Sequence, residues 1–303
     1  MRVLLLSAYA AQSHVYWARG LQQMFPGWGW TCLELPPRYF SWRVRGNPLT
    51  WSQTERDSLQ QDFDLLVATS MVDLATLRGL VPSLAAIPTL LYFHENQFDY
   101  PQDRQQHSLL EAQMVSLYSA LAADRIAFNS AYNRDSFIAG CGELLGRMPD
   151  KVPPGIPQLL QAKSTLLPVP LLPQRSQPPS WPGTAGEISE RPLRILWSAR
   201  FEHDKGGEGL NAILEQLEAA GLVYELAITG QQFRNSPAIF SRIEQIFSHR
   251  LVQFGYMESA ADYTGLQASA DIVLSTAIHE FQGLAVLQAV QAGCIPVVPD
   301  RLA

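Results

Sequence analysis

The sequence predicts an α/β protein with two domains, each built on a parallel β-sheet, that face each other across a cleft. Short apolar runs alternate with helical segments in both halves of the chain, as in sheets buried on both faces. A proline-rich stretch at 153–192 interrupts this alternation. With 303 residues, 47% of them hydrophobic, the chain is long enough for two cores. We expect a first domain at 1–170, a linker at 171–192 and a second domain at 193–303.

The first half begins with an apolar run that is read as a buried strand and not as a signal peptide, because a helical pattern follows directly. The strands expected in this half are 2–10, 30–36, 62–70, 88–96 and 124–130, with another near 165–169. The expected helices are 14–25, about 73–80, 105–123 and 131–148.

The second half repeats the alternation. Its expected strands are 193–199, 223–230, 250–256, 270–276 and 294–298, and the segments between them, such as 207–218, are expected to be helical. Ligands of open parallel sheets bind beyond the carboxyl ends of the strands. Candidate functional residues are therefore sought at those ends.

Composition excludes several classes of protein. The formal charge of −6 gives no overall attraction to nucleic acid or anionic lipid, and no segment approaches the length of a membrane span, so no membrane partner is expected. Three widely spaced cysteines form neither a metal-binding pattern nor a disulfide framework, which favours a reducing, cytoplasmic location and no metal site. One local basic patch stands out: Arg38, Arg43 and Arg45 lie in an aromatic-rich stretch.

Two cations follow the first strand of the second domain. Arg200 stands at the end of the strand and Lys205 just before the helix expected at 207–218. A guanidinium and an ammonium at a helix amino terminus suit a diphosphate, through charge-assisted hydrogen bonds and the helix field. The same residues would also fit a charged surface loop.

Other polar residues follow later strands of this domain. Glu280 lies between a strand and a helix, where a carboxylate can accept hydrogen bonds from two sugar hydroxyls or simply favour the helix terminus. Gln288 lies about two turns on, where its amide would reach ribose hydroxyls or remain a polar helix residue. Gly230 ends a strand and would let the backbone approach a ligand, or serve as an ordinary turn glycine. Together these residues suit a nucleotide sugar.

In the first domain, polar residues follow the strand at 88–96 and its neighbour. His94 is placed directly at a strand end, where it suits hydrogen bonding to a sugar hydroxyl, or a structural loop role. Asn129 occupies the corresponding end of the next strand. Ser13 and His14 open the first helix; Ser13 is a candidate N-cap, and His14 is expected to reach the cleft.

These motifs resemble a known family. The chain is similar to the retaining glycosyltransferases of family-four type, which have the GT-B fold, and more closely to the glycosyltransferase-like group that includes tRNA-queuosine mannosyltransferases. The matching segments are YFHENQ at 92–97, FNSAYNRDSF at 128–137, ARFEHDK at 199–205, QFGYMESAADY at 253–263 and the run at 273–299. The resemblance covers nearly the whole chain outside the proline-rich stretch.

The resemblance implies GDP-mannose as donor, queuosine-bearing tRNA as acceptor, transfer with retention and no metal cofactor. By position it implies that Arg200 and Lys205 hold the diphosphate, that Glu280 contacts the donor sugar, that Gln288 contacts the ribose and that His94 lies beside the transferred sugar. The matched segments add further candidate residues. Those for the nucleotide sugar are Gly230, Phe281 and Gly283, and those for the substrate are Ser13, His14, Glu95, Asn96, Gln97 and Asn129.

The chain departs from the family pattern in three places. Gln288 stands where the larger family usually carries a glutamate, and Ala11-Gln12 stands where close relatives tend to have Gly-Gly. The resemblance also implies a further strand and helices after Val298, so the second domain is expected to lack its carboxyl-terminal end. Two alternatives remain beside a queuosine transferase: the same fold with a lipid, glycan or metabolite acceptor, and a catalytically silent protein that binds nucleotide sugar or tRNA.

Overall fold

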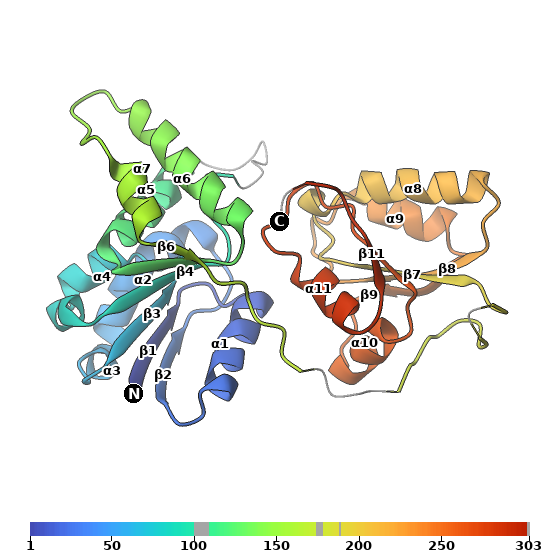
Figure 1. Cartoon of the computed structure of the whole chain (residues 1–303), viewed down its shortest axis with the longest axis horizontal. Helices are drawn as coiled ribbons and strands as arrows, with labels where there is room; N and C mark the ends of the chain where they lie inside the picture. The colour runs from blue at the N-terminus through green and yellow to red at the C-terminus, as the bar shows by residue number, and fades with distance from the viewer. Residues whose placement is uncertain (100–108, 174–177, 188, 302–303) are drawn as a thin grey trace. The chain divides into compact units, whose positions relative to one another are not determined.

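The computed structural model describes the whole chain except residues 100–108, 174–177, 188 and 302–303. The described residues form two compact units, which divide after Pro170. Each unit has its own parallel sheet between helices, as expected from the sequence (Figure 1). No helix in the described part of the chain is long and apolar enough to span a bilayer.

Unit 1 carries a six-stranded parallel sheet in the order β2-β1-β3-β4-β5-β6. The strands are β1 (Arg2–Ser7), β2 (Gly29–Glu34), β3 (Leu65–Thr69), β4 (Thr89–Phe93), β5 (Arg125–Phe128) and β6 (Ser164–Leu166). The helices are α1 (Gln12–Met24), α2 (Phe40–Thr54), α3 (Arg56–Leu59), α4 (Leu74–Leu80), the 3-10 helix η1 (Pro82–Ala86), α5 (Leu110–Ala122), α6 (Ala131–Gly146) and α7 (Ile156–Ala162). The part of the helix predicted at 105–123 that precedes residue 109 lies outside the described residues.

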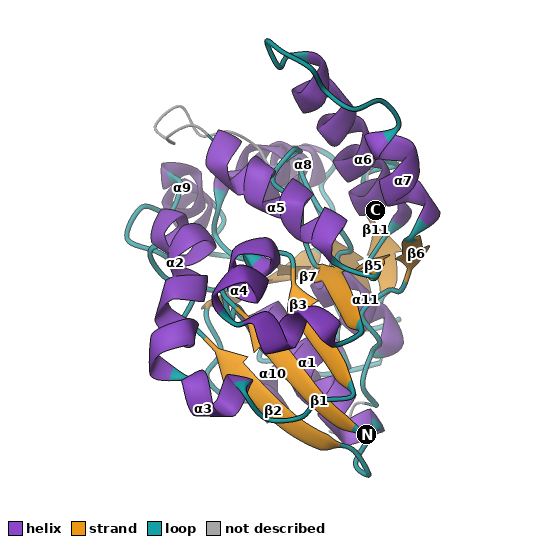
Figure 2. Cartoon of the chain, turned by 90° about the vertical axis from the view of Figure 1, so that its left-hand side faces the viewer, coloured by secondary structure: helices purple, strands orange, loops and turns teal. Residues whose placement is uncertain are grey.

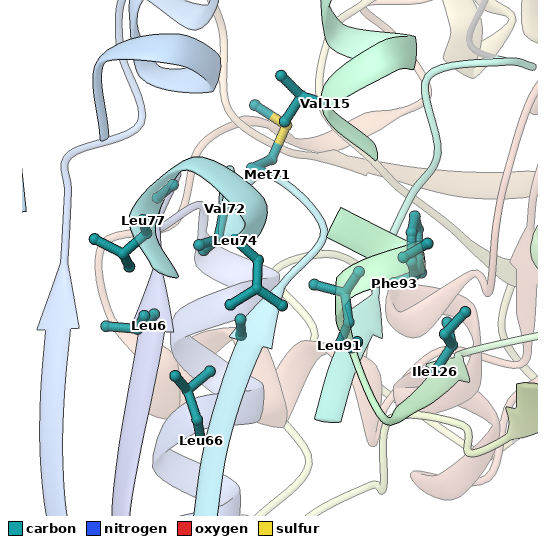
Figure 3. Packing of buried hydrophobic residues seen from close by; sticks show 14 of the residues in the cluster. Leu6, Leu66, Met71, Val72, Leu74, Leu77, Leu91, Phe93, Val115 and Ile126 are labelled. Atoms are coloured by element: carbon teal, nitrogen blue, oxygen red, sulfur yellow. The ribbon is translucent and has the colours of Figure 1, made fainter. Parts of the chain in front are cut away.

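Alternating side chains bury both faces of this sheet, because successive residues of a strand point to opposite sides. One face packs under α2, α4, α5 and α6, and residues such as Leu6, Leu91 and Phe93 belong to its core (Figures 2 and 3). On the other face, Tyr92 stacks on Trp17 of α1 at a ring-centroid distance of 4.4 Å. Helices on both faces leave the strand ends as the place where polar loops gather.

Helix α2 was not expected from the sequence, because Gly46, Asn47 and Pro48 look like a turn. Proline has no N–H, so the carbonyl of Val44, four residues before Pro48, loses its helical donor. The buried side chain of Asn47 supplies a replacement, since its Nδ2 donates to the Val44 carbonyl at 3.0 Å and to the Arg43 carbonyl at 2.7 Å. Side-chain hydrogen bonding therefore keeps a proline inside a helix.

The described residues of the proline-rich stretch form regular structure and specific contacts. The stretch begins with α7 and β6, which belong to unit 1, where the sequence predicted only a strand near 165–169. Further on, Trp181 Nε1 donates to Glu225 of unit 2 at 2.6 Å. Arg191 makes a bidentate ion pair with Asp271 at 2.7 and 2.8 Å. The end of this stretch is thus fastened to unit 2.

Unit 2 carries a five-stranded parallel sheet in the order β11-β10-β7-β8-β9. The strands are β7 (Leu193–Ser198), β8 (Tyr224–Thr229), β9 (Leu251–Gly255), β10 (Ile272–Leu274) and β11 (Ile295–Val297). The helices are the 3-10 helix η2 (His203–Lys205), α8 (Gly207–Ala219), α9 (Ala238–Ile246), α10 (Ala260–Gln267) and α11 (Leu284–Gln291). Helices α8 and α9 cover one face, and α10 and α11 the other (Figure 1).

Candidate functional site

In unit 2, the loops after β7 and β10 lie together at the carboxyl edge of the sheet. The Asp204 carbonyl accepts from the backbone N–H of Ile278 at 2.8 Å. The Lys205 carbonyl accepts from Thr276 Oγ1 at 3.0 Å. Gly206 begins α8 with φ of 71°, and a Cβ at this position would overlap the Thr276 carbonyl. Only glycine allows these two loops to approach so closely.

Lys205, Asp204 and Glu280 form a charged group in this place, which we call the lysine cluster. The Lys205 ammonium lies 3.0 Å from Asp204 Oδ2 and 3.1 Å from Glu280 Oε2. Burial disfavours the charged ammonium, but Glu280 and Asp204 more than offset this, so the pKa of Lys205 is raised. The cation is therefore fixed in place and charged at neutral pH.

Glu280 is also hydrogen-bonded to its own loop, because its Oε1 accepts from the Phe281 N–H at 3.0 Å. Burial opposes ionisation, but the nearby Lys205 and backbone donors lower the pKa of Glu280 on balance. Phe281 is buried, and its ring meets that of His279 edge-on at 4.4 Å. Gly283, with φ of 72°, begins α11. A narrow hollow lies between these loops and is lined in part by Lys205, Glu280 and Gly283.

Arg200 stands at the edge of the lysine cluster and is more exposed than Lys205. Its guanidinium forms an ion pair with Glu202 at 3.0 Å. Burial raises the pKa of Glu202, although Arg200 acts in the opposite direction. Arg200 thus lies on the solvent side of the lysine cluster, whereas Lys205 is enclosed between its two carboxylates.

Two other predicted residues of unit 2, Gly230 and Gln288, do not line the hollow. Gly230 follows β8 with φ of 155°, and a Cβ there would overlap the Ala199 carbonyl, so the backbone that approaches this glycine is the chain's own. Gln288 is half-buried on α11 and is not among the residues that line the hollow. Its contact with a ribose stays a prediction.

In unit 1, His94 follows β4 directly, as predicted, and is 6% exposed. Its ring stacks on that of His14 at a centroid distance of 4.1 Å and meets Trp17 edge-on at 4.9 Å. His14 Nε2 lies 3.1 Å from Glu95 Oε2. We call His14, His94 and Glu95 the histidine cluster. The structure thus brings together three residues that the sequence placed on two separate segments.

The electrostatics of His94 are set by burial. Burial first, and the neighbouring His14 second, lower its pKa well below the ordinary value of 6.5. Among the described residues, neither His94 Nε2 nor His14 Nδ1 has a hydrogen-bond partner. A neutral imidazole carries one donor and one acceptor, which suits an uncharged hydroxyl group.

Buried amides hold the loop that carries His94. Asn129 Nδ2 donates to the His94 carbonyl at 2.8 Å, and Asn133 Nδ2 donates to the Phe93 carbonyl at 3.1 Å. Asn96 Nδ2 donates to Asn133 Oδ1 at 2.9 Å. The side chains of Asn96 and Asn129 are therefore engaged with the protein, and their contact with substrate stays a prediction. Gln97 is also buried, and its carbonyl accepts from Gln113 at 3.1 Å.

The start of α1 differs from the sequence expectation. Ser13 is exposed inside the helix and is not its N-cap, because the helix begins after Ala11, which has no side-chain cap. Ala11 has φ of −64°, an ordinary extended residue that does not need glycine. Trp17 lies about one helical turn after His14, so the two side chains share one face of α1.

Sequence reasoning missed Asp204 and Trp17, although signals for both were present. Asp204 precedes Lys205, and a carboxylate beside a cation at a helix start is a candidate partner. Trp17 lies three residues after His14, a spacing that puts both on one helix face. Among the described residues, no group of three or more His, Cys, Asp or Glu side chains is placed to hold a metal ion.

Comparisons with known proteins agree with this architecture. The family described as tRNA-queuosine alpha-mannosyltransferase N-terminal matches residues 2–171. A Drosophila melanogaster protein named tRNA-queuosine alpha-mannosyltransferase is 34% identical over 274 residues, which cover 89% of this chain and 71% of that protein.

Solved glycosyltransferase structures share the fold at low sequence identity. A UDP-forming trehalose-phosphate synthase from Burkholderia xenovorans aligns with a TM-score of 0.63 at 11% identity, over 99% of this chain and 84% of that one. The lipopolysaccharide outer core galactosyltransferase WaaB, in its apo form, aligns with a TM-score of 0.53 at 12% identity, over 100% and 82%. The chain therefore has the GT-B fold that the sequence predicted.

Proposed function

Because the chain belongs to the tRNA-queuosine alpha-mannosyltransferase family, we propose that it is a retaining glycosyltransferase that moves mannose from GDP-mannose to queuosine in tRNA. The observation that carries the donor half of this proposal is Lys205, a charged ammonium held between two carboxylates at the start of α8. The acceptor rests on the family alone.

We assign the diphosphate to the beginning of α8. Lys205, Arg200 and the free backbone N–H groups of the first helical turn offer positive charge where the leaving group gains negative charge. Fixed charges at the leaving group stabilise the transition state without reorganisation. The protein's cations would in this way supply the charge that a metal supplies elsewhere.

Glu280 and His94 are assigned to the transferred sugar. Glu280 Oε1 accepts from backbone N–H groups and Oε2 from Lys205, which orients the carboxylate and leaves lone pairs for sugar hydroxyls. His94, neutral and stacked on His14, offers its unpartnered nitrogen to a hydroxyl.

The reaction balances without an enzymic nucleophile. The bond from the sugar's anomeric carbon to the phosphate oxygen breaks, and a bond to the acceptor hydroxyl oxygen forms on the same face. The hydroxyl proton passes to the departing phosphate oxygen, so the products are GDP and the mannosylated nucleoside. Lys205 and Arg200 stabilise the departing charge throughout.

Mass spectrometry of queuosine-bearing tRNA incubated with the protein and GDP-mannose tests the proposal. We expect one hexose to be added to queuosine, none to be added to tRNA that lacks queuosine, and addition by a Lys205→Met variant to be slower by about 10²–10³-fold. Donor consumption with no change to the tRNA would point to a lipid, glycan or metabolite acceptor. Donor binding without consumption would indicate a silent binding protein.

A further inference from the structure

The segment that joins β2 to α2 and the first turns of α2 is basic and aromatic. Residues 35–54 contain three arginines and no Asp or Glu, although the whole chain has a formal charge of −6. Tyr39 is 71% exposed and Trp42 is 52% exposed. Figure 2 shows α2 along one side of unit 1, beside α4. This segment is thus basic in a chain that is acidic overall.

The two rings are held in place although they are exposed. Tyr39 is the single non-glycine residue with positive φ in the described part of the chain, at 54°, and the Arg38 guanidinium lies 5.7 Å from its ring centroid. Left-handed backbone at a bulky residue is uncommon and persists where the surroundings enforce it. The next residue, Phe40, meets Tyr9 edge-on at 6.2 Å and packs against the core, so it anchors the turn.

Trp42 lies flat on its own helix. A Cβ added at Gly46, one turn further along α2, would overlap the indole ring of Trp42. Because Gly46 has no side chain, the indole of Trp42 packs directly on the helix backbone. The other side of the ring remains exposed. Glycine lowers the stability of a helix, so a glycine inside α2 is expected to have a packing role. The space that Gly46 leaves for the Trp42 ring is such a role.

Arg45 continues the exposed side of α2 beyond Trp42. It forms ion pairs with Asp73 and with Glu111, the latter at 3.3 Å. These three residues line an open hollow of about 500 Å³, together with the half-exposed ring of Tyr118. A hollow of this size, with donors and acceptors on its wall, can take an unstacked base.

We propose that this face of unit 1, formed by Arg38, Tyr39, Trp42 and Arg45, binds a single-stranded segment of the acceptor RNA by stacking bases on the two rings. Aromatic rings next to arginines are the combination that holds single-stranded nucleic acid, since every base has a face to stack and every linkage a charge. The inference rests on the proposed function, because tRNA is the nucleic acid the enzyme would have to hold.

The topology places this face near the histidine cluster without overlapping it. The face follows the carboxyl end of β2, and His94 follows that of β4, three strands away in the order β2-β1-β3-β4. The far end of the face lies closer, because Arg45 pairs with Asp73, which follows β3, the neighbour of β4 in the sheet. None of the four residues of the face belongs to the histidine cluster, so we assign to the face the nucleotides that flank the modified one, and not the reacting hydroxyl.

Steady-state kinetics with separate KM values for tRNA and for donor test the proposal. In Tyr39→Gly, which keeps the left-handed backbone free of strain, and in Trp42→Ala, we expect KM for tRNA to rise about tenfold or more, as loss of base stacking implies. KM for GDP-mannose should not change. Gly46→Ala should raise KM for tRNA as well, because it displaces the Trp42 ring without removing it. Arg38→Gln should lower the slope of log affinity against log salt by roughly 0.7.

Matched controls lie elsewhere on unit 1. Phe25 is 37% exposed and stacks on Trp28 just before the amino end of β2, and Arg19 is exposed on α1. Phe25→Ala and Arg19→Gln should leave both KM values unchanged. Folding of every variant is checked by its melting temperature. If the variants of Arg38, Tyr39, Trp42 and Gly46 keep the wild-type KM and affinity for tRNA, the proposal is wrong.

Two further outcomes separate this inference from the proposed function. A wild-type protein that binds tRNA through this face but adds no mannose would leave the inference standing and overturn the proposed reaction. An aromatic and basic face can also bind anionic lipid, so binding to vesicles of phosphatidylcholine with phosphatidylserine is measured too. Vesicle binding lost in Trp42→Ala, with tRNA affinity unchanged, would overturn the inference.

Discussion

Lys205 in unit 2 is charged and paired with carboxylates, whereas His94 in unit 1 is neutral and packed against aromatic rings. Lys205 is fixed by two carboxylates, and the balance of forces raises its pKa. His94 is stripped of solvent by His14 and Trp17, and its pKa falls. Both residues are buried near the end of a strand. Lys205 stays charged because it has anionic partners, whereas His94 has none and is neutral.

This difference suits the two parts of a nucleotide sugar. A diphosphate carries full charge and needs a fixed cation, while a sugar carries neutral hydroxyls and is recognised by neutral donors and acceptors. We therefore expect substitutions of Lys205 to affect the leaving group and substitutions of His94 to affect the sugar. The effects should also differ in size, since charged hydrogen bonds contribute more than neutral ones.

The largest effect should come from Lys205→Met. Removing a preorganised cation from the leaving group should lower kcat/KM by about 10²–10³-fold. Asp204 and Glu280 would also lose their partner, so the melting temperature should fall. Arg242→Met is the control, because its pair with Glu215 is exposed and spans 3.6 Å. Wild-type kcat/KM in Lys205→Met would remove the diphosphate assignment.

Arg200→Ala should rank second. Its guanidinium is about half-exposed and paired with Glu202, so it serves the leaving group without the support of a buried pocket. A charge-assisted hydrogen bond of about 1.5–3 kcal/mol corresponds to a loss of roughly 10- to 150-fold in kcat/KM. Arg200→Lys should recover part of the rate. An unchanged rate in Arg200→Ala would show that Lys205 acts alone.

His94→Gln should rank third. Loss of a neutral hydrogen bond of about 0.5–1.5 kcal/mol predicts a fall of roughly 2- to 12-fold in kcat/KM. Asn129→Ala is a useful comparison, because it loosens the His94 carbonyl without removing the imidazole. If His94→Gln had as large an effect as Lys205→Met, a neutral hydroxyl contact would not be enough to describe its role.

The low pKa of His94 also predicts how stability changes with pH. The unfolded chain takes up a proton at this residue below about pH 6.5, the ordinary value, whereas the folded protein does not until a much lower pH. The free energy of unfolding should therefore decrease as the pH falls below 6.5, and this contribution is complete above it. Denaturant titrations should show that the free energy of unfolding depends less on pH below 6.5 in His94→Gln than in the wild type. An equally steep pH dependence in the two proteins would contradict the burial of a neutral imidazole.

The smallest effect should come from Gln288→Glu. If Gln288 contacts the ribose, a carboxylate should accept its hydroxyl hydrogen bonds more strongly and tighten donor binding by about 1 kcal/mol, or roughly fivefold. Gln291→Glu is the matched control, since it lies one turn further along α11 and is exposed. Calorimetry of GDP-mannose binding distinguishes the two. Equal affinities for Gln288→Glu and the wild type would place the ribose elsewhere.

The sequence was a good guide where one periodic pattern decides the structure. Strands β1, β4 and β7 are each built on a short apolar run, and the polar residues after them, His94 and Lys205 among them, lie where parallel topology puts them. Helix α2 could not be predicted, because its stability depends on Asn47 replacing the donor that Pro48 lacks. Helix propensity accounts for the effect of Pro48 but not for the hydrogen bonds of Asn47 that compensate for it.

The candidate site shows the same division. The positions of Lys205 and Glu280 at neighbouring strand ends followed from the sequence, but their ion pair did not, since residues 75 apart meet only through the fold. The seven residues from His14 to Gly20 gave no sign that His14 would stack on His94. Such contacts depend on side-chain packing between α1 and β4, which no local pattern records.

The most direct test of this division measures binding of GDP and of GDP-mannose by calorimetry to the wild type, Lys205→Met and His94→Gln. We predict that Lys205→Met weakens both ligands alike, because both carry the diphosphate. We predict that His94→Gln leaves GDP affinity unchanged and reduces only the gain that the mannose adds. A His94→Gln protein that loses GDP affinity, or a Lys205→Met protein that retains it, would contradict the assignment of Lys205 to the diphosphate and of His94 to the sugar.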